Sequence, residues 1–285
     1  MQLQAFAKIN LDLRILGRRD DGYHELRTVF QTIDWSDEIR IESANQFTFT
    51  EHGVTAGEEN LVMKAVRAFE QLTGETVRAS IELIKGIPSG AGLGGGSADA
   101  AVTLLGLQKL YGRQIPQAEL LPALSAIGSD VPFFLSGGRA LGTGRGNDIT
   151  LLEDDTDFGL VVVVPPVPVS TREAYSWLTL TDKSNSITGF CAQPAAYSAA
   201  EPENDFESVV FPRLPLLGEI KQDILRAGAV RASLSGTGSA LFGIFGSREA
   251  AEKAVPRLSA WGVARAIHPL SRPEYLRRIW GVAKW

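Results

Sequence analysis

A run of glycines between residues 88 and 98 is the feature of the sequence with the clearest chemical use. It follows a strand-like stretch, Val77 to Lys85, and leads into a stretch with helical spacing from about Ser97 to Tyr111. Glycine lacks a Cβ atom, so successive N–H groups can approach a phosphate, and the helix start adds unpaired N–H groups and a positive dipole end. We therefore expect a phosphate-binding loop formed by Pro88, Ser89, Gly90, Ala91, Gly92, Leu93, Gly94, Gly95, Gly96, Ser97 and Ala98. A flexible linker or a tight turn is the alternative.

Two known nucleotide-binding patterns can be compared with this loop. The Walker A pattern ends in Gly-Lys-Ser/Thr, which the sequence lacks, so a P-loop ATPase is excluded. Gly90, Gly92 and Gly95 satisfy the dinucleotide pattern G-x-G-x-x-G, so a nicotinamide-dependent oxidoreductase is a rival class. That class needs the glycines tight against the strand and a second strand after the helix. Residues 86–88 intervene here, and the segment after the helix has helical spacing instead.

The sequence pattern alone identifies a possible shared face for Lys8 but no role for either Lys8 or Asp130. Lys8 lies in an alternating stretch, residues 2–15, which predicts a half-buried strand. Strand side chains alternate between faces, so Lys8 and Asn10 share one face and can point into one cleft. Taken alone, Lys8 has the simpler interpretation of a solvated strand residue, and Asp130 that of a loop or helix-capping aspartate.

Composition limits the partners and the compartment. The net charge of -5 and the pI of about 5.4 argue against nucleic acid or an anionic membrane as a partner, because such partners need a basic surface. A single cysteine, Cys191, excludes an intrachain disulfide and a cysteine-based metal site, as expected in a reducing cytoplasm. The start of the sequence lacks a signal-peptide pattern. We expect a cytoplasmic protein with no membrane partner and no obligate protein partner.

The 285 residues are enough for two domains, and a polar cluster, Glu153 to Asp157, marks a boundary between residues 1–153 and 154–285. The valine-rich stretch at 159–169 is broken by prolines and is too short to cross a membrane, so it predicts a buried strand. Gly74 is expected to cap the helix before it. The other predicted strands are 38–49, 230–234, 240–245 and 263–268, and the other predicted helices are 60–72, 117–127, 216–227 and 249–260.

The loop, together with Lys8-Ile-Asn10 and Ser235-Gly-Thr-Gly-Ser239, resembles the three motifs of the GHMP kinases in their usual order. Thr237 is a minor departure, since serine or another small residue is also common there. Four further segments resemble the branch of the family that phosphorylates a cytidine diphosphate-linked methylerythritol, and the resemblance covers essentially the whole chain. These segments are Asp20 to Gln31, Ile127 to Phe133, Ser170 to Tyr175, and Asn204 to Glu207.

The resemblance implies an α+β fold of two domains and an ATP-dependent phosphotransferase reaction. The N-terminal domain would resemble the second domain of ribosomal protein S5, and the C-terminal domain would be ferredoxin-like. By similarity, Asp130 is the general base for the substrate hydroxyl and Lys8 stabilises developing negative charge. ATP implies Mg²⁺, for which Ser97 is a possible ligand, although capping the helix is its simpler role.

A substrate carrying cytosine needs an aromatic residue to stack on the base and polar groups to recognise its edge. The resemblance implies a stack of Phe30 or Tyr23 against Tyr175, with His24 recognising the base edge. Core packing is the alternative for each aromatic residue. The complete set of substrate-binding residues expected in this way is Asn10, Tyr23, His24, Phe30, Thr171 and Tyr175.

Overall fold

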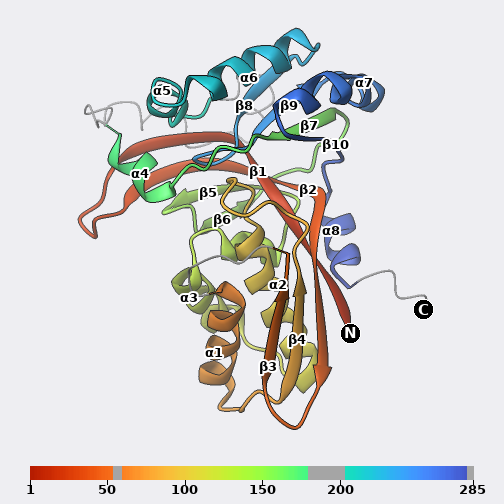
Figure 1. Ribbon diagram of the computed structural model, residues 1–285. Helices are drawn as coiled ribbons and strands as arrows, with labels where there is room; N and C mark the ends of the chain where they lie inside the picture. The colour runs from red at the N-terminus through yellow and green to blue at the C-terminus, as the bar shows by residue number, and fades with distance from the viewer. Residues whose placement is uncertain (54–59, 179–202, 281–285) are drawn as a thin grey trace.

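The computed structural model describes residues 1–53, 60–178 and 203–280, arranged around two β-sheets that each carry helices (Figure 1). Cys191 and the whole segment from Thr179 to Pro202, which matches no motif and has no assigned substrate contact, lie outside the described residues. None of the described helices is long and apolar enough to cross a membrane.

The first sheet is built around one long strand. β2 pairs with β1 along most of its length, with β4 through residues 38–43 and with β5 through residues 26–31. The order is β3-β4-β2-β5-β6, with β1 also paired to β2. The strands are β1 (Gln2–Arg18), β2 (His24–Ser43), β3 (Thr48–His52), β4 (Ala79–Ile84), β5 (Arg139–Gly144) and β6 (Asp148–Leu151).

Three helices pack on this sheet: α1 (Leu61–Thr73), α2 (Gly95–Tyr111) and α3 (Gln117–Ile127). α1 shows how the sequence sets helix ends. The Asn60 side chain accepts a hydrogen bond from the N–H of Val62, and Gly74 ends the helix with φ of 70°. The predicted cap at Gly74 is therefore confirmed. Val62 and Phe69 face the core, where both are fully buried.

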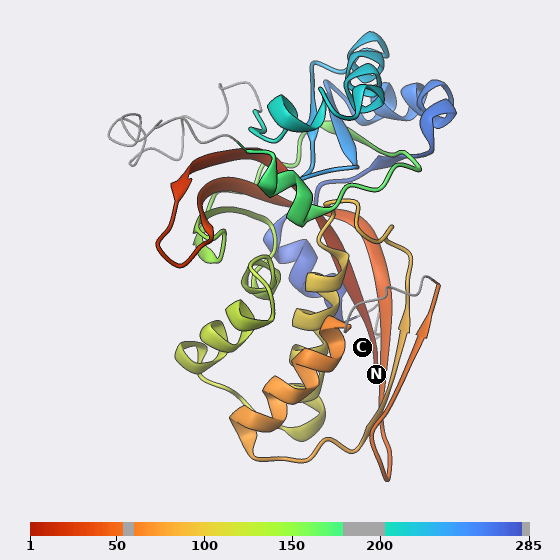
Figure 2. The same cartoon turned by 60° about the vertical axis from the view of Figure 1, so that its left-hand side comes forward.

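The second sheet has the order β10-β7-β9-β8, and each neighbouring pair is antiparallel. Along the chain its elements run β-α-β-β-α-β, which is the ferredoxin-like arrangement, as expected. α6 and α7 cover its outer side (Figure 2). The elements are β7 (Gly159–Val164), α4 (Thr171–Ser176), α5 (Glu207–Val210), α6 (Pro215–Arg226), β8 (Arg231–Leu234), β9 (Leu241–Phe245), α7 (Arg248–Leu258), the 3-10 helix η4 (Ser259–Trp261) and β10 (Val263–Ile267).

The two halves share buried surface. Ala7 and Ile9 of β1 pack in one cluster with Leu160 and Val162 of β7. The last helix, α8 (Arg272–Ile279), returns to the first sheet, and its Tyr275 is fully buried there. The Tyr275 hydroxyl donates a hydrogen bond of 2.6 Å to the carbonyl oxygen of Phe134. The predicted boundary at 153 and 154 falls in the connection between β6 and β7.

Several expectations about single elements were wrong. Residues 5–10 of β1 are buried on both faces rather than one. The second sheet covers Ala7 and Ile9 on the apolar face, and α2 and the 3-10 helix η1 (Val131–Leu135) cover the face of Phe6 and Lys8 that was expected to meet solvent. The predicted strand at 38–49 is two strands separated by residues 44–47. The β5–β6 hairpin and α8 were not predicted.

Candidate active site

The glycine loop has a regular internal pattern. Gly90, Gly92 and Gly94 have φ of 69°, 79° and 70°, a conformation that side chains disfavour. Space is also short, since a Cβ atom on Gly92 would lie 2.0 Å from the carbonyl oxygen of Ser235. Between these glycines, Ala91 is buried in the shared cluster. The glycines therefore allow both the turn and the close approach of the second sheet.

The loop turns its carbonyl groups toward the protein. Three successive carbonyl oxygens accept hydrogen bonds, from the N–H of Lys8 to Leu93 (2.9 Å), from the hydroxyl of Ser235 to Gly92 (2.9 Å) and from the N–H of Ala240 to Ala91 (3.0 Å). The N–H groups of residues 92–94 have no acceptor within the described part of the chain. Free N–H groups beside a helix N-terminus make an anion-binding site.

Lys8, Asn10 and Asp130 meet beside this loop. The Lys8 ammonium lies 3.1 Å from a carboxylate oxygen of Asp130 and donates a hydrogen bond of 2.6 Å to Asn10 Oδ1. Lys8 is 3% exposed, whereas the Asp130 side chain is 32% exposed. Lys8 and Asn10 therefore do share one face, as predicted, and the carboxylate partner remains open to a ligand. Asp130 immediately precedes the 3-10 helix η1 (Val131–Leu135).

Ser235 and Thr28 form hydrogen bonds that hold Asn10 in place beside the glycine loop. The Ser235 hydroxyl bonds to Gly92 and also lies 3.4 Å from the backbone N–H of Asn10, so the third motif bridges β1 and the loop. Thr28 of β2 accepts a hydrogen bond of 2.7 Å from Asn10 Nδ2. Sequence reasoning gave Ser235 only as part of a motif and missed Thr28. The alternation of β2 places Thr28 and Phe30 on one face, but that signal does not identify their partners.

The rings of His24 and Tyr175 form a pair, and Tyr175 is close enough to Asp130 to feel its charge. The ring of His24 is 4.9 Å from that of Tyr175 and tilted by 33°, and Tyr175 also meets Phe206 edge-on. Burial, and then the charge of Asp130, raise the pKa of the Tyr175 hydroxyl. Burial, and then the charge of Arg18, lower the pKa of His24 below 6.5. Tyr175 therefore stays protonated and His24 is mostly neutral near pH 7.

The other residues expected at the substrate lie in different surroundings. Phe30 is 1% exposed and stacks on Phe133, with ring centres 4.8 Å apart. Tyr23 is 51% exposed, at the turn between β1 and β2, where the Arg145 guanidinium lies 3.4 Å from its ring centre. A cytosine stack between either ring and Tyr175 stays a prediction.

Thr171 begins α4, and its hydroxyl lies 3.3 Å from that of Thr237 in the third motif. Thr171 therefore lies beside the Ser235-to-Ser239 turn and belongs to the same helix as Tyr175. Its predicted contact with substrate stays a prediction.

Ser97 does not cap α2. The N-cap is Gly94, without a side-chain cap hydrogen bond, and Ser97 is the third residue of the helix. The capping role expected for Ser97 was wrong, because the helix begins two residues earlier than predicted. Within the described ranges no three His, Cys, Asp or Glu side chains gather as a metal site. The Ser97 hydroxyl is an oxygen ligand of the kind that Mg²⁺ accepts, and its role as a magnesium ligand stays a prediction.

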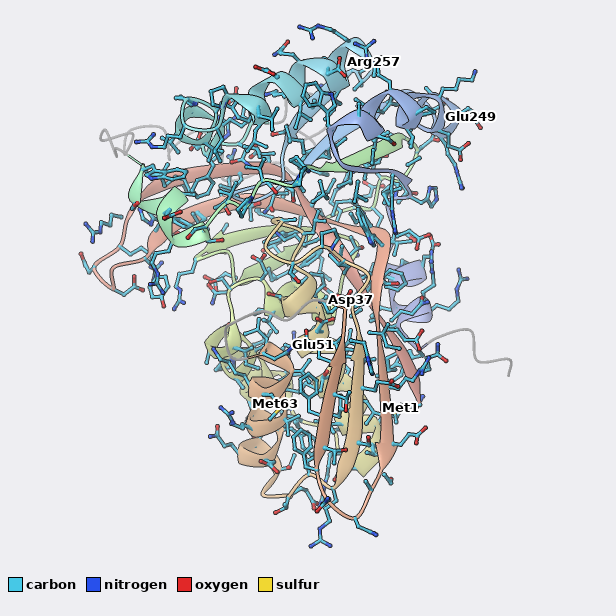
Figure 3. All side chains as sticks on the ribbon, in the orientation of Figure 1. Met1, Asp37, Glu51, Met63, Glu249 and Arg257 are labelled. Carbon is cyan, nitrogen blue, oxygen red and sulfur yellow. The ribbon has the colours of Figure 1, made fainter. Side chains whose placement is uncertain are left out.

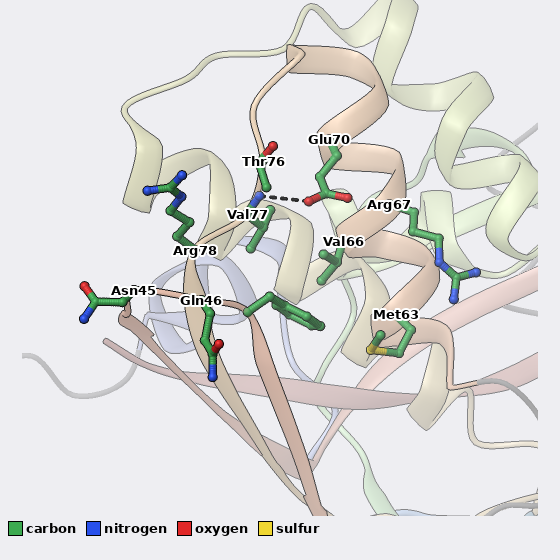
Figure 4. Close-up of a pocket in the computed structure, with 10 residues that line it drawn as sticks. Asn45, Gln46, Met63, Val66, Arg67, Glu70, Thr76, Val77 and Arg78 are labelled. Carbon is green, nitrogen blue, oxygen red and sulfur yellow. Dashed lines mark hydrogen bonds between the residues drawn. The ribbon is translucent and has the colours of Figure 1, made fainter.

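A separate cavity lies on the far part of the first domain, between α1 and the strands beside it (Figure 4). Its volume is about 480 Å³, and Glu70 on one side accepts a hydrogen bond of 2.8 Å from the N–H of Val77. None of the residues expected in the active site lines it. The lining residues are Asn45, Gln46, Phe47, Met63, Val66, Arg67, Glu70, Thr76, Val77 and Arg78.

Comparison with known proteins identifies the family. Residues 60–138 match the GHMP kinases N terminal domain, and residues 192–264 match the GHMP kinases C terminal domain. The chain belongs to the GHMP kinase family. The rival class of nicotinamide-dependent oxidoreductases is thereby excluded, and α3, rather than a strand, follows α2.

Relatives across nearly the whole chain narrow the class further. The 4-diphosphocytidyl-2-C-methyl-D-erythritol kinase of Solibacter usitatus (strain Ellin6076) is 44% identical, with 98% of this chain and 91% of that protein covered. The enzyme of the same name from Geobacter metallireducens is 40% identical, with 91% and 94% covered. A crystal structure of 4-(cytidine 5'-diphospho)-2C-methyl-D-erythritol kinase is 34% identical, with a TM-score of 0.80 over 94% of this chain and 99% of that one.

Proposed function

We propose that this chain phosphorylates the 2-hydroxyl of 4-diphosphocytidyl-2-C-methyl-D-erythritol with ATP, giving the 2-phosphate and ADP. The reaction is a step of the methylerythritol phosphate route to isoprenoid precursors. One observation carries the proposal: the Lys8–Asp130 pair, 3.1 Å apart, lies beside the glycine loop in a chain 44% identical to a kinase of that name. Another small-molecule alcohol as acceptor, within the same family, is the alternative.

The reaction needs the hydroxyl placed in line with the γ-phosphorus atom of ATP and a group to take its proton. Asp130 is the partly exposed member of the pair and serves as the base. Lys8 donates to Asn10 and faces Asp130, so its charge lies where negative charge develops on the acceptor oxygen. Because Lys8 is buried, its charge acts with little screening by water.

The loop from Pro88 to Ala98 binds the ATP phosphates through N–H groups rather than cationic side chains. The free N–H groups of residues 92–94 and the start of α2 supply this site. When bound, Mg²⁺ would supply positive charge against the ATP phosphates, and Ser97 in the first turn of α2 is the residue that would add a hydroxyl ligand.

The cytosine end of the substrate binds at the rings of α4 and the β1–β2 hairpin. A neutral His24 offers both a donor and an acceptor to the base edge, and Tyr175 offers a ring face for stacking. Asn10 and Thr171 contribute polar groups nearer the phosphates. Tyr23 and Phe30 remain candidates for a second ring. The net charge of -5 and the single cysteine support a cytoplasmic enzyme that acts without nucleic acid or an anionic membrane, and the absence of an obligate protein partner stays a prediction.

The test is ADP release by the purified chain with Mg-ATP. The cytidyl methylerythritol compound would be compared with methylerythritol phosphate, galactose, homoserine and mevalonate. Turnover with the cytidyl compound alone is expected. Selective turnover of another alcohol would support the kinase activity but contradict the proposed cytosine site. No turnover with any acceptor would contradict the kinase activity itself.

A further inference from the structure

A buried cluster of three ionisable residues lies next to the glycine loop and has no part in the mechanism above. The Lys85 ammonium lies 2.5 Å from Asp37 and 2.7 Å from Asp99. The side chains of the three are 7%, 0% and 2% exposed, respectively. Burying charge is costly unless partners compensate, so such a cluster calls for an explanation beyond stability.

The three residues come from the elements on either side of the loop. Asp37 belongs to β2, Lys85 follows the last residue of β4, and Asp99 is the fifth residue of α2. Asp37 is labelled in Figure 3, near the start of α2. Lys85 lies just beyond the end of β4, which precedes the loop. Through its two ion pairs it links β4 to α2, which follows the loop, and to the long central strand β2.

Asp37 also fixes the backbone that leads into the loop. Its Oδ1 accepts hydrogen bonds from the N–H of Gly86 (2.6 Å) and of Ile87 (2.7 Å), the two residues before Pro88. Its Oδ2 lies against the first residue of α2, 3.3 Å from the position of a Cβ atom on Gly95. One carboxylate thus accepts hydrogen bonds from the chain just before the loop and lies close to the start of α2.

The charges of the cluster are unequal. Two carboxylates share one ammonium, and Asp99 Oδ1 has no hydrogen-bond partner among the residues that the structure describes. Burial, and then the charge of Asp37, raise the pKa of Asp99 well above its ordinary value. Asp99 is therefore the carboxyl group that takes up a proton more readily, and a proton there leaves a neutral cluster in which Lys85 balances Asp37. A neutral cluster suits its place, because extra negative charge close to the start of α2 would oppose nucleotide phosphates.

We propose that Asp37, Lys85 and Asp99 are positioning residues that hold the two ends of the glycine loop in the arrangement that binds the phosphates of ATP. The proposal rests on the ATP site assigned above but not on the identity of the acceptor alcohol. It predicts that changes in the cluster alter the affinity for ATP rather than the affinity for the acceptor. It also predicts that Asp99 is needed as a hydrogen-bond partner of Lys85 but not as a negative charge.

The experiment compares four variants in steady-state kinetics, with KM measured for ATP and for the acceptor. Asp37→Asn and Asp99→Ala are expected to raise KM for ATP about tenfold or more and to lower kcat, as a displaced binding loop would. Asp99→Asn keeps an oxygen for Lys85 and should stay within about threefold of the native chain. KM for the acceptor should change less than about twofold in each.

The fourth variant controls for lost stability. Asp223 forms an ion pair with Arg257 and accepts a hydrogen bond from Trp261 in the second domain, so Asp223→Asn should lower Tm without changing KM for ATP. Equal increases in both KM values for Asp37→Asn, or an Asp99→Asn variant as impaired as Asp99→Ala, would overturn the proposal.

Direct nucleotide binding separates this proposal from the proposed function. Titration calorimetry with a non-hydrolysable ATP analogue needs no acceptor. If the chain binds the analogue but phosphorylates another alcohol, the substrate assignment fails while the cluster can still be tested. If the Asp37→Asn and Asp99→Ala variants are folded and bind the analogue as tightly as the native chain, the cluster has no positioning role.

Discussion

The part of the candidate site proposed to bind the ATP phosphates (the phosphate side) and the part proposed to bind cytosine (the base side) are built in different ways. On the phosphate side, Lys8 and Asn10 are each 3% exposed, and three carbonyl groups of the glycine loop are held by hydrogen bonds. On the base side, Tyr23 is 51% exposed, and His24 and Tyr175 touch mainly through their rings. The first region is fixed by backbone and buried polar contacts, and the second by side chains near the surface.

This difference has a physical reason. Phosphoryl transfer requires groups placed to within a fraction of an ångström, which buried hydrogen bonds provide. Recognition of a base needs a flat ring and a few polar atoms, which side chains on a hairpin and a short helix can supply. We therefore expect changes on the phosphate side to alter kcat and the affinity for ATP, and changes on the base side to alter the affinity for the acceptor.

The largest effect is expected for Asp130→Asn, which removes the base but keeps the shape. We predict a decrease in kcat of about 10²- to 10⁴-fold, the usual contribution of general base catalysis, with KM for ATP nearly unchanged. Initial-rate kinetics with both substrates will measure this. A kcat within a few-fold of the native value would remove Asp130 from the mechanism.

The next effect is expected for Gly92→Ala, with Gly90→Ala as the matched control. Both glycines have positive φ, so alanine costs about 1–2 kcal/mol at either position. Only at Gly92 would the new Cβ atom meet the Ser235 carbonyl, since nothing lies within 4 Å at Gly90. Gly92→Ala should lose a further ~1–3 kcal/mol and raise KM for ATP more than the control. Equal denaturant midpoints and KM values for the two variants would contradict the close approach.

A smaller effect is expected on the base side. Tyr175→Leu should weaken binding of the cytidyl substrate by about 1–3 kcal/mol, or roughly 5- to 150-fold in KM. Tyr175→Phe keeps the ring and should remain close to the native value. KM for ATP should be unaffected in both variants, and an equal effect of the two substitutions would favour the hydroxyl over the ring.

The smallest effect concerns pH. Because burial holds the pKa of His24 below 6.5, the ring is neutral at pH 7 and gains a proton only as pH falls through that lowered value. The unfolded chain takes up this proton at higher pH than the folded chain does. The contribution of His24 to the free energy of unfolding therefore also falls as pH decreases below 6.5. KM for the cytidyl substrate should rise as pH falls through the lowered pKa of His24 in the folded chain, and His24→Gln should abolish that rise. A rise retained in His24→Gln would assign the pH dependence to another group.

Local patterns predicted much of the fold. The glycine cap of α1, the whole of α3 and the strands of the second sheet follow from periodicity and turn residues, and those elements were found close to their expected bounds. Burial of β1 on both faces depends on the second sheet, more than 150 residues away in sequence, and no local pattern contains that information. The hairpin of β5 and β6 is rich in glycine, which hides its strand character.

In the candidate site, too, the features that local motifs contain were predicted, and those that depend on distant elements were missed. Lys8, Asn10 and the glycine loop were found together because motifs place them in sequence. Thr28 and the partners of Lys85 were missed, because a hydrogen bond between distant elements leaves no spacing signal. Asp37 and Asp99 each resemble ordinary surface carboxylates until the strand and the helix are brought together. Ser97 was misread because the first two residues of α2 are glycines, which have a low intrinsic helix propensity.

The return of α8 to the first sheet affects how the chain can fold as it is synthesised. Tyr275 fills a space in the first core and bonds to Phe134, only four residues beyond Asp130. Both sheets will therefore have been synthesised before Tyr275 is available to complete the core of the first sheet. A nascent chain that ends after β6 should remain open to proteases, and full protection should appear only once the final helix has left the exit tunnel.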